Sequence, residues 1–261
     1  MILDDIVAHK REEIAARRRA FPVPALRRMP LYAEPRRGFC EALARPPAPA
    51  VIAELKRASP SRGVIRESYE PVAIARGYAA AGARALSVLT DERFFGGELA
   101  HLAAVRAAVD LPCLRKDFLV DPYQVEEALA YGADAVLVIA AAVSGGAGEE
   151  LLATAAAAGL DVLVEVHDVN ELDWAVKAGA QCIGLNNRDL RTFRVSLETA
   201  ESLARLAPRD ALLVAESGIR SADDVRRMTA VGAQAVLVGE AFMESADPGA
   251  TLAGWMSCLS A

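Results

Sequence analysis

Short apolar runs alternate with longer, Ala-rich stretches along most of the chain. The runs have the length of buried strands, whereas the longer stretches repeat their apolar residues at helical spacing. The predicted strands are Val51–Lys56, Ala85–Leu89, Pro112–Lys116, Ala135–Ile139, Asp161–Glu165, Cys182–Asn186, Leu212–Glu216 and Ala235–Val238. The predicted helices are Pro71–Ala81, Leu99–Val109, Pro122–Tyr131, Glu149–Ala158, Val169–Ala178, Leu197–Leu206, Ala222–Val231 and Pro248–Leu259.

A Gly-Ala pair recurs where a helical stretch gives way to an apolar run. The pairs are Gly82-Ala83, Gly132-Ala133, Gly179-Ala180 and Gly232-Ala233. Glycine just past a helix end can adopt the left-handed conformation that closes the helix. Eight strands alternating with eight helices favour a (β/α)8 TIM barrel, an α/β fold. The alternative is an open doubly wound sheet, but no GxGxxG follows the first strand and polar residues end many strands rather than one crevice.

Residues 1–47 precede the first strand. Their pattern predicts helices over Leu3–Arg18 and Phe39–Ala44, joined by a connector rich in Pro and Arg. We therefore expect a single barrel domain, residues 1–261, in which 1–47 form an N-terminal helical extension and 48–261 form the barrel.

Composition and charge narrow the class of protein. The 261 residues are 53% hydrophobic, which suffices for a sizeable core. The net charge of −6 disfavours a nucleic-acid-binding protein, because such a protein needs a broad basic face. No apolar stretch reaches the length of a membrane span, and the charged N-terminus does not resemble a signal peptide. We expect a cytoplasmic protein without nucleic-acid or membrane partners.

The first forty residues are basic although the whole chain is acidic. Their basic residues are Lys10, Arg11, Arg17, Arg18, Arg19, Arg27, Arg28, Arg36 and Arg37. This segment is either a solvated helix face or a cover beside a site for an anion. The cysteines and histidines are scattered without metal-ligand spacing, so we expect free thiols and no metal site.

Charged and polar residues stand at the ends of five predicted strands. Side chains alternate between the two faces of a strand, so Glu54 and Lys56 share the face opposite the apolar Ala53 and Leu55. The same count predicts an inward cluster at the C-terminal mouth of the barrel, where enzymes with this fold carry out their chemistry. Its members are Glu54, Lys56, Lys116, Glu165, Asn186 and Glu216. Because buried charges add little net stability even when paired, the cluster predicts a catalytic site.

Small residues follow the seventh and eighth predicted strands. Ser217-Gly218 and Gly239 allow close backbone approach, and the loops after these strands often bind phosphate in such barrels. The alternative is that these glycines only make tight turns.

Seven stretches together carry a resemblance to a known family over nearly the whole chain. They are ILDDIVAHKREEI, VIAELKRASPSRG, SVLTDERFFGG, LRKDFLVDPYQV, LVEVHD, IGLNNRDL and VAESGI. The chain resembles the indole-3-glycerol phosphate synthase family, a carboxy-lyase family of tryptophan biosynthesis. The resemblance implies a decarboxylating ring closure of 1-(2-carboxyphenylamino)-1-deoxyribulose 5-phosphate to indole-3-glycerol phosphate, carbon dioxide and water. It implies no metal and no organic cofactor.

The resemblance also implies roles for single residues. Lys116 matches the general acid for ring closure, and Lys56 matches a residue that assists dehydration and contacts the anionic groups of the substrate. Glu54 and Glu165 both match proposed general bases, and the sequence does not choose between them. The remaining matches are Asn186, Glu216 and Ser217 for substrate positioning, Gly218 and Gly239 for phosphate, Ser59 and Arg188 for substrate contact, and Phe94, Phe95 and Phe118 for an apolar bed under the aryl ring. For the phenylalanines, ordinary packing is the alternative.

One position departs from some relatives, which have Ser where this chain has Glu240. A carboxylate beside a phosphate would repel it, so we expect at most the backbone N–H of Glu240 to contribute.

Three other functions fit a phosphate-binding barrel. Phosphoribosylanthranilate isomerase has a similar barrel but uses a Cys and an Asp, which the first strand of this chain does not offer. A Schiff-base aldolase would use a barrel lysine covalently, and a non-catalytic phosphosugar-binding protein would not need the acid–base cluster. The expected ligand is an anionic phosphosugar-anthranilate, and other tryptophan-pathway enzymes are candidate partner chains.

Overall fold

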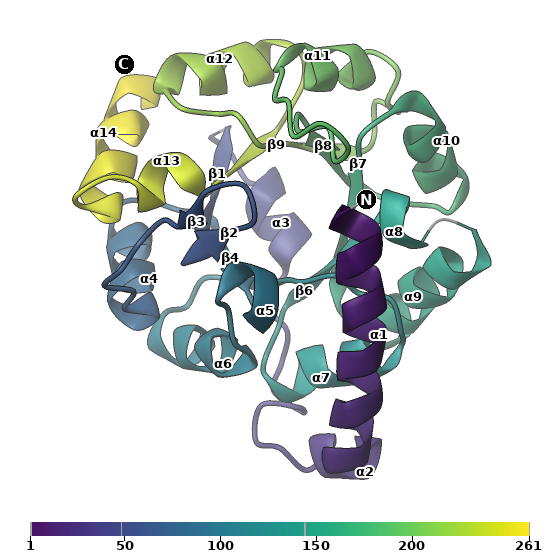
Figure 1. Cartoon of the computed structure of the whole chain (residues 1–261). Coiled ribbons are helices and arrows are strands. Elements are labelled where there is room, and N and C mark those ends of the chain that lie inside the picture. Colours follow the sequence, from purple (N-terminus) through teal and green to yellow (C-terminus); the bar gives the residue numbers. More distant parts are fainter. Residues whose placement is uncertain (1, 48, 144, 261) are drawn as a thin grey trace.

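The computed structural model describes residues 2–47, 49–143 and 145–260. Within these residues, eight parallel strands close into a barrel in the order β1-β10-β9-β8-β7-β6-β5-β4 (Figure 1). Their bounds are β1 Ala50–Leu55, β4 Ala85–Leu89, β5 Cys113–Lys116, β6 Ala135–Ile139, β7 Asp161–Val166, β8 Cys182–Asn186, β9 Leu212–Glu216 and β10 Ala235–Val238. The predicted (β/α)8 architecture is confirmed, and the open doubly wound sheet is wrong because β1 pairs with both β4 and β10.

Helices surround the barrel on its outside (Figure 1). The ring consists of α4 (Pro71–Ala80), α6 (Leu99–Ala108), α7 (Tyr123–Ala130), α9 (Gly146–Ala157), α10 (Val169–Lys177), α11 (Glu198–Ala204), α12 (Ala222–Ala230) and α14 (Pro248–Ser260). Each corresponds to a predicted helix. The prediction missed short elements, which are α2 (Val23–Leu26), the hairpin β2 (Ala58–Ser59) and β3 (Gly63–Val64), α5 (Glu92–Phe95), α8 (Ala140–Val143) and α13 (Glu240–Met243). These segments are too short to show a period.

The strands separate two apolar layers. Inward residues such as Ile52, Leu114 and Leu163 form one cluster inside the barrel. Outward residues such as Val51 and Val164 belong to a second cluster, which packs against the ring of helices. This alternation confirms the predicted assignment of faces, and it directs the polar residues at the strand ends inward.

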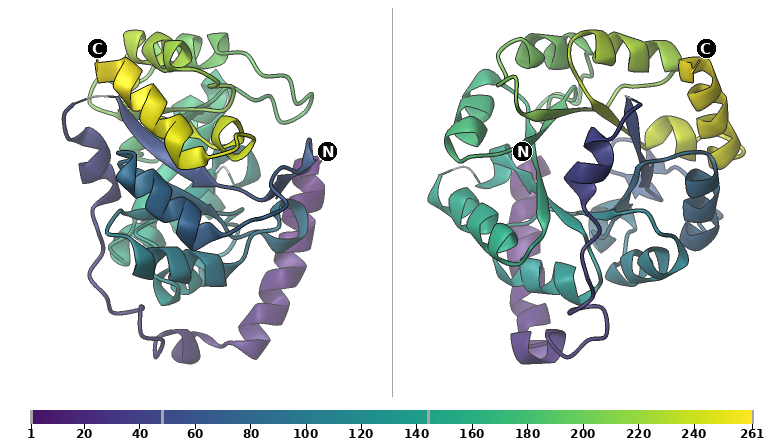
Figure 2. Two further views of the ribbon diagram at one scale, coloured as in Figure 1. Left: turned by 90° about the vertical axis from the view of Figure 1, so that its left-hand side faces the viewer. Right: turned by 180° about the vertical axis from the view of Figure 1, so that it is seen from behind.

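The N-terminal extension contacts both ends of the barrel. α1 (Ile2–Ala20) lies at the C-terminal ends of the strands, whereas α3 (Phe39–Ala44) covers the opposite end (Figure 2). Phe39 and Leu43 of α3 are fully buried and join the apolar cluster inside the barrel. α3 thus closes the end of the barrel that lies away from the cavity described below.

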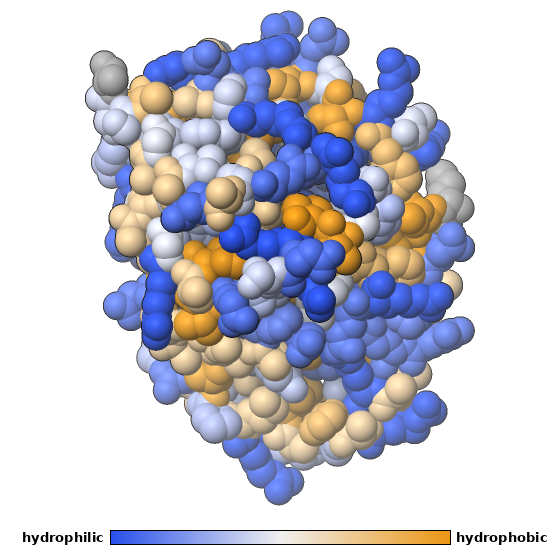
Figure 3. Space-filling view, turned by 60° about the vertical axis from the view of Figure 1, so that its left-hand side comes forward, coloured by the Kyte–Doolittle hydropathy of each residue, from blue (hydrophilic) through white to orange (hydrophobic). Residues whose placement is uncertain are grey.

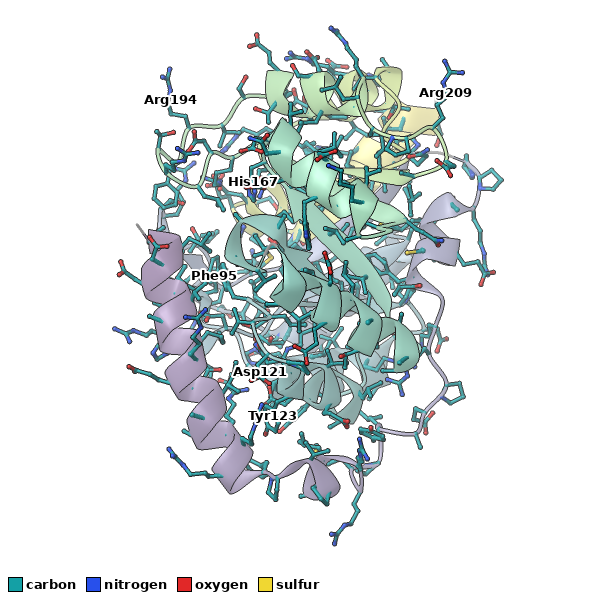
Figure 4. The ribbon with its side chains drawn as sticks, turned by 90° about the vertical axis from the view of Figure 1, so that its right-hand side faces the viewer. Phe95, Asp121, Tyr123, His167, Arg194 and Arg209 are labelled. Atoms are coloured by element: carbon teal, nitrogen blue, oxygen red, sulfur yellow. The ribbon has the colours of Figure 1, made fainter. Side chains whose placement is uncertain are left out.

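Basic residues of the extension pair with acidic residues of the barrel. Lys10 is fully buried, and its Nζ lies 2.9 Å from both Asp91 Oδ2 and Asp117 Oδ1. Arg18 pairs with Asp121, which lies beside α1 together with Tyr123 (Figure 4). Other pairs are Arg17 with Glu92 at 2.8 Å and Arg27 with Glu126 at 2.6 Å. These pairs attach the extension to the barrel, which neither interpretation included. Arg18 and Arg27 are still 52% and 58% exposed, as a solvated helix face would be, and the cover beside an anion site stays a prediction.

The surface of the molecule mixes hydrophilic and hydrophobic residues on the face drawn in Figure 3. On the face shown in Figure 3, hydrophobic residues form small patches separated by hydrophilic ones. Among the described residues, no helix combines the length and the apolar character that crossing a membrane requires.

Candidate active site

A cavity of about 620 Å3 opens at the C-terminal ends of the barrel strands. All six polar residues predicted from the strand ends line it, namely Glu54, Lys56, Lys116, Glu165, Asn186 and Glu216. Phe118, Arg188, Ser217, Gly218 and Gly239 line it as well. The alternation of side chains along a strand therefore brought together residues that lie far apart in the sequence.

Lys116 stands at the end of β5 between two carboxylates. Its Nζ donates to Glu165 Oε2 at 2.8 Å and lies 3.4 Å from Glu216 Oε2. Burial alone would lower the pKa of Lys116, but the charges of Glu165, Glu216 and Glu54 outweigh it and raise that pKa above its ordinary value. Lys116 is therefore an ammonium ion with a proton to donate.

Glu165, at the end of β7, is surrounded by donors. Its Oε1 accepts from Asn186 Nδ2 at 2.9 Å and lies 3.2 Å from His167 Nε2. Burial acts to raise the pKa of Glu165, yet Lys116 and His167 outweigh it and hold that pKa well below its ordinary value. Glu165 is therefore ionised at neutral pH.

Glu216, at the end of β9, has fewer partners than Glu165. It is 2% exposed, and its Oε1 accepts no hydrogen bond from the described residues. Burial raises the pKa of Glu216 to about 8, although Lys116 acts in the other direction. A Cβ on Gly184 of β8 would lie 2.0 Å from Glu216 Oε1, so only glycine leaves room for this carboxyl group. Two carboxyl groups beside one lysine thus differ in protonation at neutral pH.

Glu54 and Lys56 form a second pair at the mouth. Lys56 Nζ lies 3.2 Å from Glu54 Oε1. A Cβ on Gly239 would lie 2.6 Å from the same oxygen, so this glycine is required by Glu54. The prediction connected Gly239 only with phosphate.

One wall of the cavity is apolar. Phe95 and Phe118 lie with ring centroids 5.9 Å apart, and Leu89, Leu137 and Ile139 extend the same wall. Phe94 is not among the described lining residues, because its ring packs edge-on against His9 at 5.7 Å. α5 thus presents Phe95 to the cavity and Phe94 to the extension.

The facing wall is made of small residues. β9 and β10 lie across the barrel from β5 and β6 in the order of strands. After β9, Ser217 and Gly218 both have positive φ, 62° and 77°. A Cβ on Gly218 would lie 2.4 Å from Val195 Cγ1. Ser217 and Gly218 therefore make a sharp turn that only a residue without a side chain can complete.

Three arginines surround one carboxylate beside this wall. Glu240 lies 2.8 Å from Arg62, 3.2 Å from Arg220 and 3.3 Å from Arg188. All four side chains line the cavity. The Glu240 side chain thus lies at the cavity, whereas the expectation that at most its backbone N–H contributes to phosphate binding stays a prediction.

Ser59 lies outside the described lining. It is 9% exposed in β2, and its Oγ lies 3.4 Å from Ser61 Oγ. Ser61, which follows in the turn between β2 and β3, lines the cavity instead. The sequence could not show this difference, because the hairpin left no periodic signal.

Sequence reasoning missed His167 and Gly184, although both had a signal. His167 stands two residues after Glu165, just past the end of β7, which keeps it near that carboxylate. Gly184 interrupts a strand pattern, which marks close approach of another group. Arg62 and Arg220 had no comparable signal, because both lie in loops.

Asp117 follows Lys116 and has a fully occupied carboxylate. Its Oδ1 accepts from the backbone N–H of Phe118 at 2.8 Å and lies 2.9 Å from Lys10 Nζ. Its Oδ2 accepts from Thr90 Oγ1 at 2.7 Å and from Arg115 Nη2 at 3.0 Å. Burial would raise the pKa of Asp117, but Lys10 and Arg115 lower it well below its usual range.

The described residues contain no group of three or more His, Cys, Asp or Glu side chains arranged to hold a metal ion.

The family model and the relatives that match this chain carry the same family name. The sequence model of the family described as "Indole-3-glycerol phosphate synthase" matches residues 3–253. A relative with that name from Acidithiobacillus ferrooxidans is 52% identical over 254 residues, which cover 96% of this chain and 97% of the relative. Another from Burkholderia vietnamiensis is 51% identical over 255 residues, covering 97% of both chains.

Solved structures resemble the chain in fold. 3-Hexulose-6-phosphate synthase from Salmonella typhimurium aligns with a TM-score of 0.65 at 17% identity, covering 81% of this chain and 98% of that one. At this identity the likeness supports the barrel fold alone.

Proposed function

Because the chain belongs to the indole-3-glycerol phosphate synthase family, we propose how its cavity carries out the decarboxylating ring closure of that family. The enzyme is a carboxy-lyase of tryptophan biosynthesis that acts on a phosphorylated substrate. The proposal concerns the residues that do this and the part each one takes.

The observation that carries the proposal is the distribution of polarity in the cavity. An apolar aromatic wall at β4 to β6 faces a wall of Ser217, Gly218 and Gly239, with paired lysines and glutamates between them. The substrate has the same order of parts, which are an aryl carboxylate, a ketone-bearing chain and a phosphate. Phe95 and Phe118 contact the aryl ring, and the two loops after β9 and β10 bind the phosphate together with Lys56.

Ring closure requires an acid at the ketone oxygen. The aryl carbon that bears the carboxylate attacks the ketone, and Lys116 donates its proton to the oxygen as negative charge develops there. Carbon dioxide then leaves and its bonding electrons remain in the ring system. The position of Lys116 between two carboxyl groups keeps it protonated before this step.

Dehydration requires a second acid and a base. Lys56 protonates the departing hydroxyl group, and Glu165 removes the proton that completes the indole. The choice of Glu165 over Glu54 rests on Asn186, whose Nδ2 donates to Glu165 Oε1 and orients it. Glu54 is engaged with Lys56 and positions it.

Substrate contacts complete the assignment. Arg188 contacts the substrate from the loop after β8, and Ser61 takes the place that the sequence assigned to Ser59. Glu216 and Ser217 position the sugar chain. Phe94 is assigned to packing with the extension.

The test is a turnover assay with purified protein and 1-(2-carboxyphenylamino)-1-deoxyribulose 5-phosphate, followed by indole fluorescence. Lys116→Met should lower kcat by roughly a hundredfold or more, the usual scale for a general acid, and change KM only a few-fold. Lys177→Met is the matched control, since Lys177 is 73% exposed and pairs with Asp173 on the surface. Near wild-type turnover by Lys116→Met would contradict the role of Lys116.

Borohydride treatment in the presence of substrate separates this mechanism from a Schiff-base aldolase. We expect no reduced substrate–lysine adduct by mass spectrometry. A reduced adduct on Lys116 or Lys56 would show that the lysine forms a Schiff base with the substrate, and it would contradict the proposed acid–base mechanism.

A further inference from the structure

His167 lies behind Glu165, on the side away from the substrate cavity. It follows β7 and precedes α10, and Figure 4 labels it at that helix. Its Nε2 lies 3.2 Å from Glu165 Oε1, and its Nδ1 lies 2.9 Å from Glu171 Oε2. A line of alternating charge therefore runs outward from the cavity, from Lys116 through Glu165 and His167 to Glu171.

The position of Glu171 is fixed by the start of α10. The side chain of Asp168 caps this helix by accepting from the backbone N–H groups of Asn170 and Glu171, at 2.8 and 2.9 Å. Glu171 Oε2 in turn accepts from the backbone N–H of His167 at 2.8 Å. The Glu171 carboxylate is thus hydrogen-bonded to both the backbone and the ring of His167, so the imidazole has little freedom to rotate.

His167 does not belong to the cavity surface. It is absent from the described lining residues, and its side chain is 10% exposed. Any effect of His167 on the reaction must therefore pass through Glu165.

We propose that His167 and Glu171 are positioning residues for Glu165, with Glu171 holding the imidazolium in place and the imidazolium keeping the Glu165 carboxylate ionised and oriented. This inference rests on the proposed function, in which Glu165 is the general base.

The order of steps gives this arrangement a purpose. Lys116 is the other cation that contacts Glu165, and it gives up its proton to the ketone during ring closure. At that moment Glu165 loses one of its two counter-charges. His167 supplies the remaining one, so Glu165 stays ionised until it removes the proton in the dehydration step.

The charged groups around the pair agree with this role. Glu165 faces Lys116 from β5 and Glu216 from β9, and Asn186 from β8 donates to it. Glu54 of β1 acts on Lys116 and Glu216. His167 faces only Glu165 and Glu171 among the charged groups described, and α8, which packs against β7 and α10, contributes only Ala and Val. Burial would lower the pKa of His167, but these two carboxylates raise it to about 10.

The experiment compares the pH dependence of kcat in the wild type and in His167→Gln. Glutamine is uncharged and removes the ion pair with Glu165, so the pKa of Glu165 should rise. The acid limb of kcat should move upward by about one pH unit, the scale expected for loss of one adjacent charge. KM at neutral pH should stay within twofold of the wild type, because His167 does not touch the substrate.

A second test variant and a control accompany His167→Gln. Glu171→Gln should shift the acid limb in the same direction by a smaller amount, and it tests the inference even if His167→Gln fails to fold. His101→Gln is the matched control: His101 lies on α6 and packs edge-on against Tyr69, so its profile should match the wild type.

Different results would contradict the inference and the proposed function. If the acid limbs of His167→Gln and Glu171→Gln coincide with that of the wild type, the inference is overturned. A rise in KM without a shifted kcat profile would overturn it too, since that pattern indicates a distorted cavity. If Glu165→Gln keeps wild-type turnover, the proposed base itself is wrong.

Discussion

Asp117 and Glu216 are both 2% exposed at the mouth of the barrel, yet their surroundings differ sharply. Four donors or cations occupy the two oxygens of Asp117. Glu216 has a cation 3.4 Å from one oxygen and no donor from the described residues at the other. A buried carboxyl oxygen without a hydrogen bond is costly, and this agrees with our assignment of Glu216 to the substrate.

The difference extends to the two clusters around these residues. Lys10, Arg115 and Asp117 form a closed ion network that joins the extension to the barrel. Lys116, Glu165 and Glu216 surround an open space. Two charged clusters that are neighbours in sequence thus differ in environment: one is closed and joins two parts of the fold, and the other is the cluster to which we assign the chemistry.

The largest expected effect comes from breaking the closed network. Lys10→Met leaves Asp91 and Asp117 buried without their shared cation, and breaking a buried ion pair typically costs about 3–5 kcal/mol. Urea denaturation should show this loss in the free energy of unfolding. Lys177→Met, which removes an exposed lysine, should leave that free energy nearly unchanged. Equal, small changes in both variants would mean that Lys10 has no structural role.

The second effect is a difference in pH dependence. The pKa of Glu216 is raised to about 8 in the folded chain, so between its ordinary value of 4.5 and 8 the native state holds a proton that the unfolded state releases. The free energy of unfolding should therefore fall as pH rises through this window, by at most about 1.4 kcal/mol per pH unit. In Glu216→Gln this decline should be absent below about pH 6 and smaller above it, where His167, whose pKa is raised from 6.5 to about 10, contributes a decline of the same sign.

Asp117 should change the free energy of unfolding with pH in the opposite direction. Its lowered pKa stabilises the fold above its ordinary pKa, and this stabilisation is lost as pH falls through the acid range. Asp117→Asn should remove that acid-side loss and leave the slope near neutral pH unchanged. Denaturation curves of the three proteins from roughly pH 2 to 8 test both signs, because the Asp117 contribution is lost only below its ordinary pKa of 3.8. Identical slopes in Glu216→Gln and the wild type would refute the contrast.

The smallest expected effect concerns Glu240, at the exposed edge of the cavity. Glu240 pairs with Arg62 and Arg220, which are 49% and 54% exposed beside the proposed phosphate loops, and we expect it to weaken their attraction for the substrate phosphate. Glu240→Gln should lower KM a few-fold, more strongly at low ionic strength, because screening weakens exposed charges. Glu244→Gln is the matched control, since Glu244 pairs with the same arginines outside the described lining. A raised KM in Glu240→Gln would show that Glu240 organises the arginines instead.

The regular part of the molecule could be predicted from the sequence because strand and helix periods are local properties. β4, β6, β8, β9 and β10 begin and end at the predicted residues, and the inward cluster followed from the alternation of faces. The period of a strand depends only on the backbone, so one count placed Lys116 and Glu165 in the same cavity.

The irregular part could not be predicted, for a physical reason in each case. Phe94 and Phe95 are adjacent and equally apolar, and only the one-turn helix α5 decides which enters the cavity. Lys10 looked like a solvent-facing residue of a basic helix, because its acidic partners are far away in the sequence. The protonation of Glu216 depends on burial and on neighbours from other strands, which no local pattern contains.

The docking of α1 through Lys10 and Arg18 also sets an order of events during synthesis. Arg18 and its partner Asp121 are 103 positions apart. At about 5–20 residues per second, α1 leaves the ribosome roughly 5–20 s before the segment that receives it. During this interval Leu3, Ile6 and Ile14, which the folded chain buries, have no barrel to pack against. The N-terminal helix is therefore made first and docked late, and over those seconds its apolar stripe is a surface that a chaperone can bind.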